Sequence, residues 1–286
     1  MTTKKLGAFT KKVEELAAKG RVNIAFGLAT PDKEILDCLS KMSEYADITL
    51  VGPGAIKDVK GFKLVIDENP EQKIASMLAS DEVEGIIRGT IDDFKTADAY
   101  KKITGEHFDL NPGLMETPKG DQLFCGLCSN PEGWNKEERF EIAKGIAEFT
   151  KKWGVEPKIA VFTGVRHETY KRKKDIKDGV VGILNKTYED TEWIVSELKK
   201  LGYDAKNWSI DLDLAVEDGA NVIVPVNGMV GNQLFRAILL SGGRIMAAPR
   251  VVCKRPYEDN SRNEKDFSFH VKWLAAWINS KKLNNK

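Results

Sequence analysis

Long hydrophobic runs are missing from this 286-residue chain, and so is any strong net charge. A membrane-spanning helix needs roughly 20 consecutive apolar residues, and no stretch of the sequence approaches that length. The 44 Lys and Arg residues almost balance the 43 Asp and Glu residues, which leaves a net charge of +1. A balanced chain has no electrostatic reason to bind nucleic acid or an anionic membrane. We therefore expect a soluble protein without a nucleic-acid partner or a membrane span.

Residues 1–20 also lack the apolar core of a secretory signal peptide and carry lysines in its place. Their pattern predicts a first amphipathic helix instead. Without an export signal, the protein is expected in the cytoplasm. The chain is long enough to form one large domain or two of ordinary size.

Cysteine is scarce, with four residues at Cys38, Cys125, Cys128 and Cys253. Four scattered cysteines do not make a disulfide scaffold. The pair in "CGLC" has the C-x-x-C spacing of zinc and redox sites, but a structural zinc site needs a second pair of ligands, which the sequence does not offer. Because the pair lies in the apolar run "QLFCGLCSN", we predict that it packs in the core and that the chain has no metal site.

Short β-rich runs alternate with amphipathic helical patterns, which predicts an α/β fold with mostly parallel strands and helices on both faces. The rhythm breaks at residues 106–121, where Gly, Pro and polar residues cluster, so a crossing between two domains is predicted there. We expect strands at residues 21–29, 47–54, 62–67, 84–90, 122–128, 158–164, 221–226 and 244–252. We expect further helices at residues 31–45, 69–80, 94–103, 135–154, 188–202, 230–243 and 267–280.

Two glycine motifs follow predicted strands. "VGPGAIKD" begins like a dinucleotide-binding fingerprint, but Lys57 occupies the position of the third glycine, so a strand-ending turn is the better interpretation. "VNGMVGNQLF" opens a helix, where free N–H groups and the helix dipole favour an anion. Asn227, Gly231 and Asn232 are therefore candidate ligand-binding residues. A simple strand-to-helix turn is an alternative of equal weight.

The basic run at residues 166–174 also has two interpretations. It could hold a multiply charged phosphate ligand, or it could be a solvated helix face. We favour the solvated face, since most charge runs are of that kind.

The stretch "PYEDNSRNEKDF" (residues 256–267) gathers charged and polar residues just before an apolar helix. A solvated loop is one interpretation, because Asn, Asp, Ser and Pro are ordinary turn residues. An anion site is the other, because Arg262 could hold a phosphate or an oxyanion with two hydrogen bonds. Asp266 could accept a proton from a thiol or hydroxyl, or it could cap the last helix.

Three segments, in order, resemble the phosphate acetyl/butyryltransferase family. "EGIIRGTIDDFKTADAYKKI" is similar to its D-G-x-x-S-G…T-A-D-x-x-R-P segment, and "NVIVPVNGMVGNQLFRAILLSGG" to its apolar strand, A-G-N and G-G segment. "KRPYEDNSRNEKDF" is similar to its K-P-x-x-D-L-S-R-G segment. The resemblance implies two α/β domains of the isocitrate-dehydrogenase-like type with an active cleft between them. Residues 1–120 with 250–286 would form the first domain, and residues 121–249 the second.

The same resemblance implies roles for individual residues. Asp266 would deprotonate the thiol of coenzyme A, and Arg262, next to Ser261, would hold phosphate and stabilise the transition state. These three are the predicted catalytic residues. The predicted ligand-binding residues are Arg88, Gly89, Thr90, Lys101, Asn227, Gly231 and Asn232.

The chain departs from the family pattern around this anion site. Arg88 stands where the family has Ser, Asn263 replaces the Gly after Ser–Arg, and Lys101 replaces an Arg. Lysine lacks the planar two-point clamp that arginine offers to phosphate. The resemblance therefore implies the family fold with an altered anion site, rather than ordinary acetyl phosphate chemistry.

The segments "GLATP", "IIRGT", "NPGLMETP" and "GMVGNQLFRAILLSGGR" most resemble the methanogenesis marker protein 4 group, which consists of archaeal proteins described as methyltransferase subunits. This implies a transferase of methanogens that binds an anionic small molecule, works with methyltransferase partner subunits and forms a homodimer. Its cofactor is unknown; coenzyme A and a one-carbon carrier are both compatible. Two alternatives stay open: a phosphate acyltransferase that uses coenzyme A, and a non-catalytic binding or assembly subunit.

Overall fold

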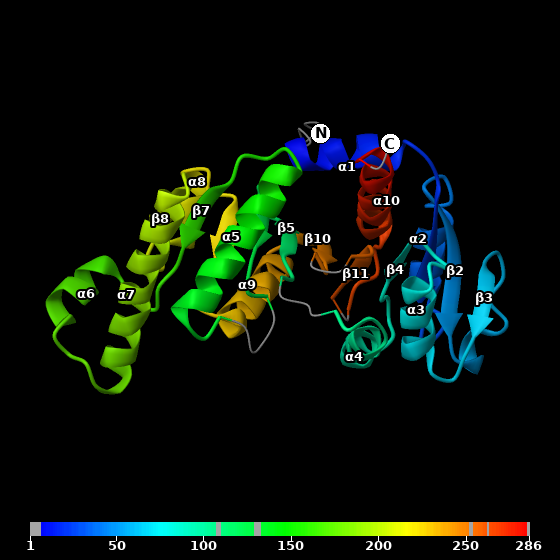
Figure 1. Ribbon diagram of the computed structural model, residues 1–286, viewed down its shortest axis with the longest axis horizontal. Coiled ribbons are helices and arrows are strands. Elements are labelled where there is room, and N and C mark those ends of the chain that lie inside the picture. Colours follow the sequence, from blue (N-terminus) through cyan, green and yellow to red (C-terminus); the bar gives the residue numbers. More distant parts are fainter. Residues whose placement is uncertain (1–6, 107–109, 129–132, 252–253, 262, 285–286) are drawn as a thin grey trace. The chain divides into compact units, whose positions relative to one another are not determined.

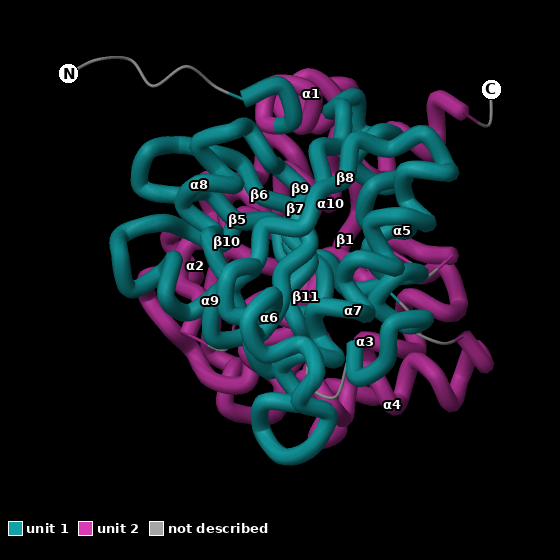
Figure 2. The backbone as a smooth tube through the Cα atoms, turned by 90° about the vertical axis from the view of Figure 1, so that its left-hand side faces the viewer, with its two compact units in different colours: residues 1–9, 110–245 teal, residues 10–109, 246–286 magenta. Residues whose placement is uncertain are grey.

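The computed structural model describes residues 7–106, 110–128, 133–251, 254–261 and 263–284. The chain divides into two compact units, which Figure 2 shows in different colours. Unit 1 comprises residues 1–9 and 110–245, and unit 2 comprises residues 10–109 and 246–286. The chain passes from unit 1 to unit 2 within helix α1 (Ala8–Ala17).

The sheet of unit 2 is mostly parallel. The strands from β3 to β11 pair in parallel, and β11 pairs antiparallel with β10, which belongs to this unit from Met246 onward. Their order across the sheet is β3 (Lys63–Ile66), β2 (Ala46–Gly52), β1 (Val22–Gly27), β4 (Gly85–Ile87), β11 (Tyr257–Asp259) and β10 (Arg244–Pro249).

Helices cover both faces of this sheet. Ile86 of β4 belongs to the same core cluster as Ile74 of α3 (Pro70–Ala79), whereas a Cβ on the preceding Gly85 would lie 3.0 Å from Ile278 of α10 (Ser268–Asn284). Because successive residues of a strand point to opposite faces, α3 and α10 lie on opposite faces of β4. The unit also contains the short 3-10 helix Gly54–Ile56, together with α2 (Lys33–Ser40) and α4 (Asp93–Thr104), which Figure 1 labels.

The sheet of unit 1 has one antiparallel pair, β5 with β6, and parallel pairs elsewhere. The strand order is β5 (Gly113–Glu116), β6 (Gln122–Cys125), β9 (Val222–Val224), β7 (Lys158–Val161) and β8 (Asp204–Asn207). The helices are α5 (Lys136–Lys152), α6 (His167–Lys173), α7 (Gly179–Lys200), α8 (Leu212–Glu217) and α9 (Gly228–Leu240).

The predicted fold class is confirmed, since the structure is mixed α/β with mostly parallel strands. Every strand and helix expected from the sequence is present, although α2 ends at Ser40 rather than near residue 45. The prediction of core packing is confirmed for Cys125, which is fully buried, while Cys128 is half-buried. Cys253 lies outside the described residues. Among the described helices, none is long and apolar enough to cross a membrane.

Candidate functional site

The carboxyl ends of β1, β4 and β11 share one edge of the unit 2 sheet, because the three strands are parallel neighbours. The chain leaves β1 toward β2 on one side, and leaves β4 toward the side where β11 lies. Ligands of open α/β sheets bind outside the strand ends at such a reversal of direction. This carboxyl edge carries Ala29 after β1, Gly89 and Thr90 after β4, and Asn260 and Ser261 after β11.

Gly89 and Thr90 fasten the end of β4 to the end of β1. The Thr90 N–H donates to the Gly27 carbonyl at 2.8 Å, and the Thr90 Oγ1 accepts from the Ala29 N–H at 2.9 Å. Gly89 has a φ of 65°, and a Cβ there would lie 2.0 Å from the Gly27 carbonyl oxygen. Only glycine combines that backbone conformation with so close an approach.

Asn260 extends the pairing of β4 with β11, because its side-chain amide makes the two hydrogen bonds that a backbone N–H and C=O would make. Its Oδ1 accepts from the Gly89 N–H at 2.9 Å, and its Nδ2 donates to the Gly89 carbonyl at 2.9 Å. The same Nδ2 donates to the Ser261 carbonyl at 2.8 Å. The amide is buried, so these bonds fix the backbone on both sides of the edge.

Arg88 lies beneath this edge and is 2% exposed. Its Nη1 donates to the carbonyls of Gly89 and Ile91 at 2.6 and 3.2 Å, and its Nη2 donates to the carbonyl of Asn260. Its Nε donates to Asp259 Oδ1 at 2.8 Å. The guanidinium thus satisfies carbonyls that no strand partner reaches. It holds the ends of β4 and β11 together.

Asp259 is the counter-ion of two arginines. Besides Arg88, its Oδ2 accepts from Arg250 Nη2 at 2.6 Å. Burial alone raises the pKa of the Asp259 carboxyl, but the attraction of Arg250 and Arg88 outweighs burial and lowers it. Asp259 therefore stays ionised inside the protein. The role of Arg88 in ligand binding stays a prediction, because the contacts of its guanidinium in the structure are with the chain itself.

The predicted catalytic residues follow β11. Ser261 is half-buried, and its carbonyl accepts from the Glu264 N–H at 3.2 Å, while Arg262 lies outside the described residues. Asp266 is exposed and caps α10, since its Oδ1 accepts from the Ser268 N–H at 3.0 Å. This contact favours the helix-capping alternative for Asp266. A role as general base is not tested by this contact.

A thiol of the chain itself lies beside this carboxylate. The Cys38 Sγ on α2 donates to Asp266 Oδ1 at 3.5 Å. Burial and the neighbouring Asp266 charge raise the pKa of the Cys38 thiol to about 11. Burial raises the pKa of Asp266, but hydrogen bonds from Ser268 and Cys38 outweigh it and lower the pKa. The pair is thus a neutral thiol against an ionised carboxylate at neutral pH.

Lys101 is a half-buried residue in the last turn of α4. On the same helix, the Thr96 side chain is fully buried and its Oγ1 donates to the Asp92 carbonyl one turn earlier. This threonine of the T-A-D motif therefore supports the first turn of the helix.

The other predicted binding residues lie in unit 1. Asn227 caps α9, with its Oδ1 accepting from the Val230 N–H at 3.0 Å. A Cβ on Gly231 would lie 2.0 Å from the Leu127 carbonyl oxygen, so glycine lets α9 approach the segment that follows β6. Asn232 Nδ2 donates to the Cys128 carbonyl at 3.0 Å. The three residues meet at the carboxyl ends of the neighbouring strands β6 and β9.

The predicted residues that the structure describes lie in both units. Unit 2 contains Arg88, Gly89, Thr90, Lys101, Ser261 and Asp266, and unit 1 contains Asn227, Gly231 and Asn232. The structure also shows residues that the sequence did not single out as site residues, namely Glu258, Asp259, Asn260 and His270. Their signal was the stretch of residues 256–267 itself, where charges precede an apolar helix. The sequence predicts residues 244–252 as the last strand, and the acids that follow it therefore fall in a predicted loop.

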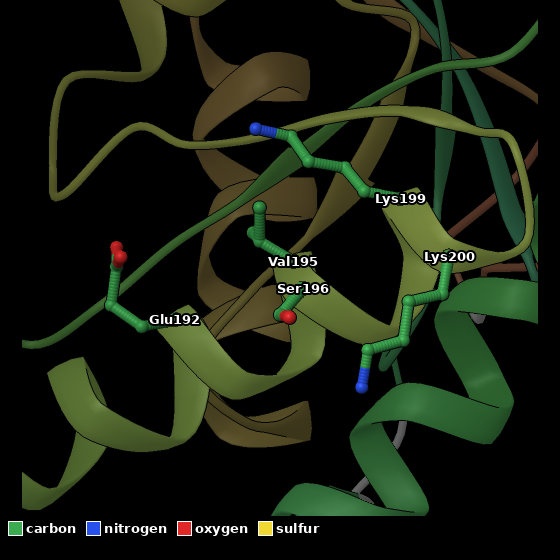
Figure 3. Close-up of a pocket in the computed structure, with 5 residues that line it drawn as sticks. All are labelled: Glu192, Val195, Ser196, Lys199 and Lys200. Carbon is green, nitrogen blue, oxygen red and sulfur yellow. The ribbon is translucent and has the colours of Figure 1, made fainter.

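Two surface hollows lie away from the carboxyl edges described above. One of about 480 Å³ runs along α7, where Glu192, Val195, Ser196, Lys199 and Lys200 line it (Figure 3). Another of about 570 Å³ lies in unit 2 at the opposite ends of the strands, near Arg21 before β1 and Lys63 at the start of β3. Helix α6, formed by the basic run, has no buried residue. This favours the interpretation of that run as a solvated face.

No protein-family model matches the chain. The chain is 29% identical over 284 residues to "Putative methyltransferase mtx subunit X" of Methanosarcina mazei, covering 98% of both proteins. It is 28% identical to the protein of the same name from Methanosarcina barkeri, covering 94% of this chain and 98% of that protein. The resemblance to this group of archaeal proteins is confirmed.

Solved structures of phosphotransacylases share the fold. A branched-chain phosphotransacylase from Enterococcus faecalis has a TM-score of 0.65 at 17% identity, covering 89% of this chain and 99% of that one. A phosphotransacetylase from Streptococcus pyogenes has a TM-score of 0.66 at 12% identity, covering 96% of this chain and 98% of that one. The phosphate acetyltransferase-like fold is therefore confirmed.

Proposed function

We propose that this protein is a transferase subunit of methanogenic archaea that works in methyl transfer and binds an anionic ligand at the carboxyl edge of unit 2. The observation that carries the proposal is similarity along almost the whole chain to Methanosarcina proteins named as methyltransferase subunits. The phosphotransacylase-like fold supports the anion site, since those enzymes are named for moving acyl groups to and from phosphate.

The geometry of the edge supports an anionic ligand near Ser261. The Ser261 carbonyl accepts from the Asn260 side-chain amide and from the Glu264 N–H, and these two bonds fix the backbone at this residue. A site whose backbone is already ordered does not lose that entropy again when a ligand binds. Arg262 follows directly in the sequence and would supply the charge for a phosphate or carboxylate group.

An ordinary phosphate acyltransferase is the second candidate, favoured by the fold alone. Two observations weigh against it. The Asp266 carboxylate, the expected base for a coenzyme A thiol, accepts hydrogen bonds from the Ser268 N–H and the Cys38 thiol. Lys101 stands where the family has a second arginine, which removes a two-point phosphate clamp. A non-catalytic binding or assembly subunit remains the third reading, with the same ligand site.

The rest of the proposal concerns partners and location. We propose that the protein acts in the cytoplasm as a homodimer and associates with further methyltransferase subunits. The word subunit in the names of its relatives supports such partners. For the cofactor, we propose a one-carbon carrier or coenzyme A.

A thermal-shift panel on the full chain tests the proposal. It compares a methyl-corrinoid, tetrahydromethanopterin, S-adenosylmethionine, coenzyme A and acetyl phosphate, each near 100 times the dissociation constant measured by titration. A specific ligand at that concentration stabilises the folded chain by about 2.7 kcal/mol. We expect a one-carbon carrier to do so, and we expect the effect to vanish in Arg262→Ala.

Arg21→Ala is the matched control, because Arg21 is an exposed arginine of the same unit that pairs with Asp47. It should leave the ligand effect intact. Stabilisation by coenzyme A and acetyl phosphate, with no response to one-carbon carriers, would establish the acyltransferase alternative. If no ligand of the panel stabilises the protein, a non-catalytic subunit becomes the preferred interpretation.

A further inference from the structure

A buried ionic cluster lies beside the carboxyl edge of unit 2. His270 of α10 and Glu258 of β11 are both 0% exposed, and His270 Nδ1 lies 2.7 Å from Glu258 Oε1. The same Oε1 accepts from the Ala248 N–H of β10 at 2.7 Å. On the other side of the ring, His270 Nε2 lies 3.9 Å from Glu264 Oε2. One imidazole therefore lies between two carboxylates from different segments.

The cluster leaves two buried polar atoms without hydrogen-bond partners, Glu258 Oε2 and His270 Nε2. An uncompensated charge at such depth costs several kcal/mol, so the charge state of the cluster matters. Asp259 and Asp266 are the other ionisable groups that act on these residues. All four neighbours are acids. Asp259 also has Arg88 and Arg250 as partners, while the imidazolium is the cation that lies beside Glu258 and Glu264.

Glu264 connects the cluster to the proposed ligand site. Its Oε1 accepts from the N–H groups of Lys265 and Asp266 at 2.9 and 3.0 Å, and its own N–H donates to the Ser261 carbonyl. We call residues 263–266 the capping segment, because Asp266 caps α10. Whatever holds Glu264 in place also holds the capping segment and the backbone next to Ser261.

We propose that His270 is a positioning residue: its imidazolium, held between Glu258 and Glu264, orders the capping segment, and loss of the proton releases that segment. The effect on ligand binding rests on the proposed anion site. Without the proton, Glu264 loses its attraction to the ring, and Glu258 becomes a buried charge with only a neutral partner. Burial opposes the charged ring, but the hydrogen bond to Glu258 and the nearby Glu264 carboxylate outweigh burial and raise the pKa of His270 to about 9.

Titration of the histidines by NMR tests the first step on the full chain. The sequence contains three histidines, so the spectrum is simple, and His270→Gln assigns the resonance of interest. We expect His270 to titrate near pH 9. A pKa at or below the ordinary value of about 6.5 would overturn the proposal. If His270→Gln does not fold, His107→Gln and His167→Gln together assign the third signal to His270 by elimination.

Hydrogen exchange of the capping segment tests the second step. We expect its protection, corrected for the intrinsic rate, to fall about tenfold or more between pH 7 and pH 9.5. In Glu264→Gln the fall should be smaller, while His167→Gln, a histidine of unit 1 that contacts Tyr188, should behave as wild type. A pH dependence that is equal in wild type and Glu264→Gln would refute the role of the cluster.

Binding of inorganic phosphate, measured at the same two pH values, tests the link to function. Weaker binding at pH 9.5, with no such change in Glu264→Gln, supports the proposal together with the anion site. Release of the capping segment with no phosphate binding at either pH supports the role of His270 and counts against the anion site alone.

Discussion

Replacing Arg88 by methionine tests whether this buried arginine serves the fold or a ligand. The change removes donors to the carbonyls of Gly89, Ile91 and Asn260, and it removes one of the two cations beside Asp259. Breaking a buried ion pair from one side costs about 3–5 kcal/mol. Asp259 keeps its bond to Arg250, so we expect about 3 kcal/mol, at the lower end of that range.

Urea unfolding at pH 7 measures this loss, and hydrogen exchange locates it. A change of about 3 kcal/mol lowers the ratio of folded to unfolded protein more than a hundredfold. Amides of β4 and of residues 88–91 should lose protection first. Arg21→Met is the control, because Arg21 pairs with Asp47 on the surface and its side chain is 54% exposed. A surface pair of this kind contributes less than about 1 kcal/mol.

Phosphate binding to the same two variants decides between the readings. If Arg88→Met is as stable as Arg21→Met but binds phosphate at least tenfold more weakly, Arg88 is a ligand residue and the reasoning from its contacts is refuted. If stability falls and the folded fraction binds phosphate normally, Arg88 acts through the fold. Arg88→Lys should lose most of the stability as well, because lysine cannot reach several carbonyls at once.

Three further predictions follow from individual contacts. Asn227→Ala should lower the free energy of unfolding by about 1 kcal/mol through loss of the α9 cap, whereas Asn227→Asp should not, as urea titration will reveal. Cys38 should react slowly with iodoacetamide at pH 8, because its pKa is raised to about 11, and Asp266→Asn should speed the reaction; equal rates would contradict the contact. The free energy of unfolding should fall as pH rises from about 6.5 to about 9, because the pKa of His270 is raised in the folded protein. The stabilisation by the protonated ring is complete below about pH 6.5 and is lost above about pH 9. In urea titrations over this range, His270→Gln should show a weaker pH dependence.

Much of the fold could be predicted from hydrophobic patterns. The apolar runs at β1, β2 and β9 and the amphipathic helices α3 and α5 have strong periodicity, and all appear where expected. The elements that the sequence did not predict lack a clear hydrophobic periodicity, because they are short and several of them are polar. They are β5, β8, β11, α6 and α8.

β11 shows why pattern alone fails. Its sequence, Tyr-Glu-Asp, has two acids in three residues, which is typical of a loop. Glu258 is nevertheless buried and Asp259 half-buried, because Glu258 is paired with His270 and Asp259 with Arg88 and Arg250. Arg88 is far from these acids in the sequence. Arg250 and His270 are nearer, but nothing in the sequence marks them as partners of the acids. The pairing that turns this stretch into a strand is therefore visible only in three dimensions.

The candidate site was predicted best where the resemblance supplied the pattern and worst where a side chain replaces backbone pairing. Asn260 lies between the acids and Ser261, and nothing in its local sequence distinguishes it from a turn residue. Its function in the structure is to pair with both backbone groups of Gly89. A glycine with positive φ ends regular pairing, and a carboxamide is the side chain that offers a donor and an acceptor together.

Unit 1 repeats the use of a buried arginine at strand ends. Arg139 of α5 is 3% exposed, and its Nη2 donates to the Phe162 carbonyl just after β7 at 2.8 Å and to Thr191 Oγ1 at 3.3 Å. Burial lowers its pKa to about 10, yet it remains charged at neutral pH. In both units, then, a guanidinium satisfies carbonyls where parallel strands end and regular pairing stops.

An arginine near the end of a buried strand has two competing partners, an anion from solution or the carbonyls of its own chain. A guanidinium that already donates to those carbonyls would have to exchange these bonds for a ligand. The segment that follows Ser261 in the sequence is therefore the better place to seek the anion.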